Sequence, residues 1–431
     1  MTIEYIRAKF DFKSKNNIEI ICRSDAESLE INSIYKNGHD LKSIPKSVKN
    51  IMFTGQFNQK LETNDLSEKI QSIIFGDKFN QPFEKNIQSI QFCHNSFQRV
   101  EKNILPKGLQ SIQFGHNFNQ PIEKDILPKG LQSIRFGHNF NQYIEKNILP
   151  KGLHSIIFGD IFNQIIRKNV LPDGLRFITF GSNFNQPIGK YVLPTKLKSI
   201  VFGEQFDQLI GKYILSEGLQ SIHFGHNFNQ PIEKNVFPAG LQSIHFGSLY
   251  NQPIEKDVFP VGLQSIHFDH NFNQSIEENV LPAGLQSIQF GYRFNQLIGK
   301  DVLPAGLRSI QFGYRFNQLI GKDVLPAGLQ SIHFGGCFDE CLNQSIDNIS
   351  DKTKVYLYYI PSKITRNYTN YRYHKSDLEK LIENKKVGEI YESKINDKTY
   401  YMVDVEITKP EINKEKIMEL INQLKNELDI L

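Results

Sequence analysis

The sequence predicts a mainly β repeat solenoid, in which stacked coils of 22 residues each add one strand to a parallel sheet. Two observations predict this fold: a phenylalanine that recurs at a fixed spacing, and an alternation of apolar and polar residues directly before it. The recurring residues are Phe53, Phe75, Phe92, Phe114, Phe136, Phe158, Phe180, Phe202, Phe224, Phe246, Phe268, Phe290, Phe312 and Phe334. Every step is 22 residues except the step that ends at Phe92, which is 17. Two consecutive coils, 281–302 and 303–324, differ only in that Gln286 is replaced by Arg308.

Each coil contains one predicted strand, which lies directly before the recurring phenylalanine. In one representative coil, Ser111 and Gln113 alternate with Ile112 and Phe114, so the first two should face solvent and the last two the core. Gly115 follows, and we expect it to leave the strand at a positive φ, which glycine adopts without strain. The alternation therefore predicts a short strand that ends at a glycine turn.

The remainder of the coil is predicted to lack a long helix. Pro106 and the matching prolines up to Pro326 exclude a helix interior at the start of the coil. Residues 115–126 have room for little more than a helical turn, so this return arm should be irregular or a second extended piece. At about 4.8 Å per coil, the stack would form a rod or a shallow arc. The 17-residue step before Phe92 predicts a local defect in it.

A ladder of asparagines is predicted at the turn that follows each strand. Stacked asparagines can hydrogen-bond to their copies in the coils above and below, and can satisfy backbone groups at a corner of the coil. We interpret the ladder as structural, because a residue that is copied in every coil serves the coil itself. Its members are Asn119, Asn141, Asn163, Asn185, Asn229, Asn251, Asn273, Asn295 and Asn317.

The repeated pattern "LPxGLxSIxFGxxFNQPI", found over roughly residues 44–345, resembles the FNIP repeat family. The resemblance implies a leucine-rich-repeat-like solenoid. Members of this family occur in amoebae and in large DNA viruses that infect them, and often join the repeats to an F-box that recruits a ubiquitin ligase. The chain departs from the family pattern at Gln120 and its equivalents, which stand where the name has isoleucine. Residues 1–43 show no Leu-Pro-rich helical pattern of the F-box kind, so a ligase adaptor is the alternative function.

The two ends of the chain are predicted to cover the solenoid. We expect an amino-terminal cap at 1–43, the repeats at 44–350, and a small α+β cap or module at 351–431, because open coils expose sheet edges and apolar surface. The elements expected in the last segment are a strand at 354–360, a helix that begins at Ser376, a strand at 398–407 and an amphipathic helix at 411–431. We prefer the cap to a tyrosine-rich docking module for an effector.

Composition places few constraints on the partners. A net charge of +4 does not by itself indicate a nucleic-acid partner. The four cysteines do not make a disulfide framework, and no apolar run is long enough to cross a bilayer. We therefore expect an intracellular monomer with reduced thiols, located in the host cell if the chain is viral, with no cofactor and no membrane association.

One row of outward strand residues contains the consecutive histidines His223, His245 and His267. Their imidazoles could converge on a metal ion, but no carboxylate or thiolate stands in the same row, so we interpret them as an exposed polar ladder. The combination of His333 with Cys337 lacks a fourth ligand at a recognised spacing, even with Cys341 added. No metal site is predicted.

A basic patch is predicted in the middle of the repeats. A glutamate precedes the lysine of the return arm at Glu123, Glu145, Glu233 and Glu255, but in the middle coils arginine or glycine replaces that glutamate. The candidate partner-binding residues are Arg167, Lys168, Arg176, Lys190, Lys196, Lys198 and Lys212. Rows of like charge repel, so such a row favours an acidic partner. We note no stacking aromatic residues in it, which makes nucleic acid the weaker of the two possible partners.

These patterns together predict a non-enzymatic protein-protein interaction scaffold. No phosphate loop, paired carboxylates or activated nucleophile stands outside the repeat period, and nearly equivalent copies do not build one asymmetric catalytic constellation. The alternatives are the ligase adaptor and a nucleic-acid binder that uses the basic edge.

Overall fold

The computed structural model describes one long stretch of repeats, residues 105–338, together with shorter segments on either side. These segments are 28–31, 47–53, 58, 66, 68–76, 79, 81, 87–92, 341, 344–350, 352–359, 386–395 and 398–406, with the backbone alone at 28–31, 357–359 and the last two. The chain divides into two compact units, Met1–His226 and Asn227–Leu431. Each unit is described by itself.

The first unit is a parallel sheet built from one strand per coil. Its strands are β1 (Ser28–Ile31), β2 (Asn50–Phe53), β3 (Ser72–Phe75), β4 (Ser89–Phe92), β5 (Ser111–Gln113), β6 (Ser133–Arg135), β7 (Ser155–Ile157), β8 (Phe177–Thr179), β9 (Ser199–Val201) and β10 (Ser221–His223). Each pairs in parallel with the next, and equivalent residues stand opposite each other, for example Ile112 and Ile134. The predicted parallel sheet of short strands is confirmed.

The second unit continues the same coil design and ends in antiparallel strands. Its elements are β11 (Ser243–His245), β12 (Ser265–His267), β13 (Ser287–Gln289), β14 (Ser309–Gln311), β15 (Ser331–Phe334), the 3-10 helix η2 (Ile346–Asn348), β16 (Lys354–Tyr359), β17 (Lys386–Ile395) and β18 (Lys398–Glu406). Strands β11 to β16 pair in parallel, β18 pairs antiparallel with β16, and β17 pairs antiparallel with β18.

The ends of the chain match the sequence predictions in part. The predicted strands at 354–360 and 398–407 form as β16 and β18, whereas β17 was not predicted. Most of the helix predicted from Ser376 and all of the helix predicted at 411–431 lie outside the described residues. The short step before Phe92 leaves the sheet unbroken, because β3 and β4 pair without a shift of register, so the predicted defect does not reach the strands.

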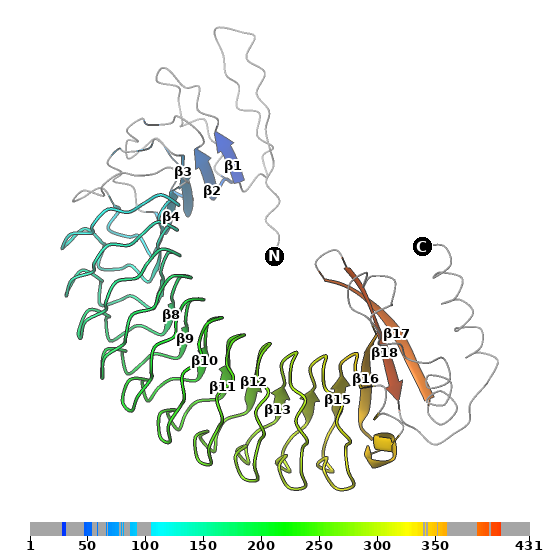
Figure 1. Cartoon of the computed structure of the whole chain (residues 1–431). Helices are drawn as coiled ribbons and strands as arrows, with labels where there is room; N and C mark the ends of the chain where they lie inside the picture. Colours follow the sequence, from blue (N-terminus) through cyan, green and yellow to red (C-terminus); the bar gives the residue numbers. More distant parts are fainter. Residues whose placement is uncertain are drawn as a thin grey trace, which may run out of the picture. The chain divides into compact units, whose positions relative to one another are not determined.

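Phenylalanine ladders form the core between the sheet and the return arms. In each unit the strands line one side of the coils and the irregular return arms close the other (Figure 1). Within a coil, Phe136 stacks on Phe140 with ring centroids 3.9 Å apart, and Phe136 also stacks on Phe158 of the next coil at 5.8 Å. Leu131 and Ile134 of the same coil are fully buried. Because rings such as Phe136 stack both within their coil and on the next coil, the core runs from coil to coil within each unit.

The glycine that follows each strand has a different role from the one predicted. Positive φ was expected there, yet none of Gly137, Gly159, Gly181 or Gly203 adopts it. A Cβ on Gly137 would instead lie 1.7 Å from the carbonyl oxygen of Gly115 in the preceding coil. The prediction of a positive φ is therefore wrong, and at these four places glycine permits a close approach of two backbones, whereas Asp269 occupies the equivalent place after β12.

Positive φ occurs instead near the end of the return arm, one residue before the apolar residue that precedes Leu-Pro or its equivalent. These positions are Asp125, Asn147, Asn169, Tyr191, Tyr213, Asn235, Asp257, Asn279, Asp301 and Asp323, with φ between 60° and 68°. Asparagine and aspartate tolerate the left-handed region better than other side chains with a Cβ, which explains most of the row. The two tyrosines are exceptions.

The asparagine ladder is hydrogen-bonded from coil to coil. The backbone N–H of Asn185 donates to Oδ1 of Asn163 at 2.9 Å, and Nε2 of Gln186 donates to the same oxygen at 3.1 Å. The same pair of bonds joins Asn141 to Asn119 one coil earlier, with Gln142 as the second donor. Asn119 and Asn163 thus each accept from a backbone N–H that has left the strand ladder, and the glutamine of the next coil contributes a second donor.

Replacing Asn163 with alanine is expected to lower the free energy of unfolding by about 1–2 kcal/mol, because a backbone N–H and an amide lose their acceptor. Urea denaturation would measure the loss. Asn163→Asp retains the acceptor and should lose less, and Asn183→Ala, at an exposed position in the next coil, should change little. Equal losses for Asn163→Ala and Asn183→Ala would contradict the structural role of the ladder.

Candidate functional site

The predicted basic patch lies on two separate parts of the coil. Lys168, Lys190 and Lys212 occupy equivalent places near the end of the return arm, where Arg167 joins them. Arg176 and Lys198 stand instead directly before strands β8 and β9, and backbone bonding links them, since the N–H of Lys198 donates to the carbonyl of Arg176 at 2.8 Å. Lys196 lies two residues before Lys198, in the turn that precedes β9. The sequence prediction thus placed in one patch residues that belong to two different parts of the coil, the return arm and the start of the strand.

Three cations of the return arm lie over tyrosine rings. The guanidinium of Arg167 lies 5.1 Å from the ring centroid of Tyr143. The ammonium of Lys168 lies 5.5 Å from that of Tyr191, and the ammonium of Lys190 lies 5.8 Å from that of Tyr213. All these distances are within the range of a cation–π attraction. We call this surface the tyrosine–lysine patch and define it as Tyr143, Arg167, Lys168, Lys190, Tyr191, Lys212 and Tyr213.

Two tyrosines of the patch are held in the left-handed region. Tyr191 and Tyr213 have φ values of 60° and 68°, where the other coils place asparagine or aspartate. This conformation costs a residue with a Cβ about 1–2 kcal/mol. Both side chains are 62% exposed and their rings stack on each other at 5.9 Å, so core packing does not explain their presence. Backbone strain at an exposed aromatic pair is typical of a functional position.

Three consecutive coils of the patch carry no acid at the end of the return arm. Neither aspartate nor glutamate occurs at 167–169, 189–191 or 211–213, whereas the equivalent places in other coils carry an acid, as at Glu145 and Glu233. Exposed apolar side chains adjoin the patch at Ile165 and Leu209, which are 52% and 59% exposed. The surface is thus basic, aromatic and partly aliphatic.

Tyr143, Tyr191 and Tyr213 were missed in the sequence reading, which noted no aromatic residues in this row. The signal was present, because Tyr191 and Tyr213 directly follow Lys190 and Lys212. In an irregular arm, however, the side chains of adjacent residues have no fixed relative orientation. The contacts of these two tyrosines with lysines of the preceding coil could therefore not be derived from spacing.

The histidine ladder lies on the sheet face but is half-buried, not exposed as expected. The rings of His245 and His267 stack at 3.9 Å in the second unit, and His223 occupies the equivalent place in β10 of the first. Further along the second unit, His333 stacks on Tyr356 at 4.2 Å. Within the described ranges, no group of three histidine, cysteine, aspartate or glutamate side chains is arranged to hold a metal ion.

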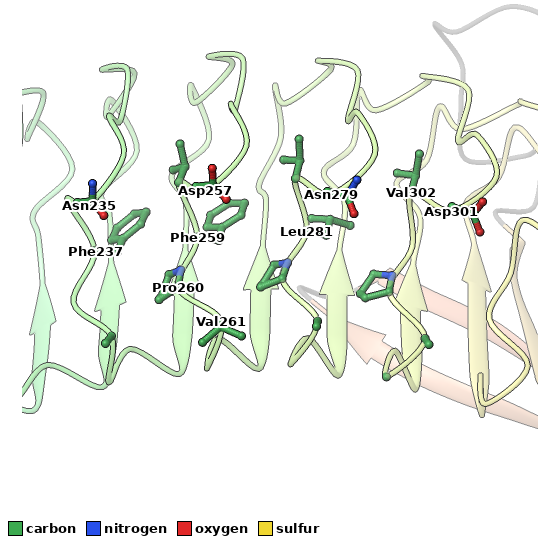
Figure 2. Close-up of a pocket in the computed structure, with 18 residues that line it drawn as sticks. Asn235, Phe237, Asp257, Phe259, Pro260, Val261, Asn279, Leu281, Asp301 and Val302 are labelled. Carbon is green, nitrogen blue, oxygen red and sulfur yellow. The ribbon is translucent and has the colours of Figure 1, made fainter.

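An open groove of about 760 Å³ crosses the return arms of the second unit (Figure 2). Phe259, Pro260 and Val261 contribute to its apolar lining, and Val261 is 75% exposed. The ionisable side chains that line it are Asp257 and Asp301, which come from coils two apart. The lining therefore offers no closely paired carboxylates for acid–base chemistry.

Stacked coils with a parallel sheet on one side and irregular arms on the other define a leucine-rich-repeat-like solenoid. The model of the FNIP Repeat family matches the chain at residues 57–93, 94–139, 118–161, 140–183, 162–205, 184–215, 206–249, 250–293 and 294–337. The chain belongs to the FNIP repeat family, which confirms the resemblance seen in its sequence.

A solved structure with the same type of fold is described as "The crystal structure of CroV588 a novel circular LRR protein structure". It is 37% identical to this chain with a TM-score of 0.63, and the match covers 73% of this chain and 50% of that one. The chain thus matches half the length of that protein. A comparison with curated proteins gives no match. In the part of the chain that the structure describes, no helix is long and apolar enough to span a membrane.

Proposed function

We propose that the protein is a non-enzymatic scaffold whose tyrosine–lysine patch binds an acidic segment of another protein. The observation that carries the proposal is that cations lie on tyrosine rings where three consecutive coils carry no acid at 167–169, 189–191 or 211–213. Such a row repels itself until an anionic partner offsets the charge. The strained Tyr191 and Tyr213 add rigid aromatic surface, which is enriched at binding hot spots.

The chemistry of the patch favours a protein over a nucleic acid. Bases bind aromatic rings by stacking on an open face. The ring of Tyr191 contacts the ammonium of Lys168 and also stacks on Tyr213, so its faces are less open to a base. The aliphatic Ile165 and Leu209 beside the patch suit the apolar side chains of a peptide. The ligase-adaptor alternative concerns the amino-terminal segment, most of which lies outside the described residues.

The test is affinity purification from the native cell with the triple variant K168E/K190E/K212E. The matched control is K124E/K146E/K234E, which makes the same charge change at equivalent places where a glutamate precedes the lysine. We expect the first variant to bind the recovered protein at least about tenfold more weakly, because charge reversal replaces attraction by repulsion. The control should bind like the natural chain.

Two results would contradict this proposal. If both triple variants lose the same proteins equally, the effect is one of overall charge and the patch has no special role. If recovery depends on nucleic acid and is abolished by nuclease, the patch binds nucleic acid and the protein partner is excluded. Binding of the purified partner at increasing salt would separate these cases.

A further inference from the structure

One residue interrupts a row of serines on the sheet face of the first unit. Every strand from β3 to β15 begins with serine except β8, which begins with Phe177. This side chain is 50% exposed, and its neighbours by register are Ser155 and Ser199. Serine fits the position in all the other strands, so the fold does not require a large apolar residue there.

Two aliphatic residues and a threonine lie near Phe177 on the same face. In the parallel register Ile157 stands opposite Thr179, and Thr179 opposite Val201. The coils on either side carry Arg135 and His223 at this place. Because residues at alternate positions of a strand share one face, Phe177 and Thr179 lie side by side with Ile157 and Val201 across the neighbouring strands. We define these four residues as the Phe177 patch.

Cations lie next to this patch along the chain, and the adjacent strands carry no acid. Arg176 and Lys198 directly precede β8 and β9, and Arg135 lies on the same sheet face in β6. Neither aspartate nor glutamate occurs at 132–135, 154–157, 176–179 or 198–201. Arg176 and Lys198 replace the glutamine found at this place in other coils, such as Gln132 and Gln220.

We propose that the Phe177 patch is a second docking site, for a protein segment that places one bulky apolar side chain against Phe177 and carries carboxylates beside it. The apolar centre would be covered by that side chain, and the cations at its rim select the acidic flanks. This site is independent of the tyrosine–lysine patch, since it lies on the sheet and not on the return arm. It would let one unit hold two segments of partner proteins on different faces.

The experiment selects random short peptides displayed on phage against the full chain. The selected peptides should share one aromatic or large aliphatic residue flanked by aspartate or glutamate. Phe177→Ser, which restores the serine row, should weaken their binding at least about tenfold without lowering the unfolding midpoint. Replacing Arg176 and Lys198 together by glutamine should weaken binding and reduce its dependence on salt.

Several results would overturn this inference. Selected peptides without acidic flanks, or peptides that bind the F177S variant as tightly as the natural chain, would show that the patch is not their site. Loss of binding in K168E/K190E/K212E but not in F177S would assign them to the tyrosine–lysine patch instead. Sedimentation that shows a dimer in the natural chain and a monomer in F177S would make a second copy of this chain the occupant.

Discussion

Phe184→Ala is expected to lower the free energy of unfolding by about 3–5 kcal/mol, the range for removing a fully buried phenylalanine. Phe184 is 1% exposed, and its ring stacks on Phe180 at 3.9 Å, on Phe162 at 6.1 Å and on Phe206 at 6.0 Å. The alanine variant opens a cavity between three coils that cannot collapse without breaking the ladders on both sides.

The matched control is Phe177→Ala in the same coil, where the ring is half exposed. Its effect on stability should be within about 0.5 kcal/mol, as for an ordinary surface substitution. Chemical denaturation of both variants measures the difference. If both variants lost the same free energy of unfolding, the difference in burial between Phe184 and Phe177 would not explain the stability of this coil.

Gly203→Ala is expected to lower the free energy of unfolding by about 3 kcal/mol or more. Its new Cβ would lie 1.8 Å from the carbonyl oxygen of Gly181 in the preceding coil, so the two backbones would have to shift apart. The effect should appear as a lower denaturation midpoint and as faster hydrogen exchange in the neighbouring strands.

Gly211→Ala provides the comparison for that substitution. A Cβ there meets nothing closer than the Cδ1 atom of Ile214, at 3.9 Å, and the residue has no positive φ. We expect this variant to be neutral or slightly stabilising, because alanine restricts the unfolded chain. If Gly203→Ala were as stable as Gly211→Ala, that result would contradict the close backbone contact between Gly203 and Gly181.

The fold could be predicted because its signals are local and repeated. The alternation at Ile112 and Phe114 defines a strand within four residues, and the fixed spacing places each strand beside its copy. Strand β17 was missed because it pairs antiparallel with β18 outside the repeat, and its sequence carries no comparable period. Contacts that depend on pairing outside the period are not visible in the spacing.

The role of the glycines was mistaken for a related reason. A glycine needed for positive φ and a glycine needed for close approach look the same in a sequence. Only the register shows that Gly137 meets the carbonyl of Gly115. Asn147 and Asp125 did carry the signal for positive φ, but Tyr191 and Tyr213 interrupt that row and conceal it.

The candidate sites were harder to predict than the fold, because function here depends on departures from the repeat. The sequence reading grouped Lys190 with Lys198, which are close along the chain, although one belongs to the return arm and the other precedes a strand. Phe177 was overlooked because an apolar residue in a strand region looks ordinary until it is compared with the serines of the other strands.

The near-identity of coils 281–302 and 303–324 bears on how such a gene changes. Because each coil contacts only its neighbours, one coil can be added or removed without a new fold. Since equivalent residues of neighbouring coils stand opposite each other, a gain of 22 residues recreates the same sheet contacts at the new junction. Such an event in the second unit would change the length of the protein while leaving Phe177 and Tyr191 with their present neighbours. The repeat thus allows length and binding surface to evolve separately.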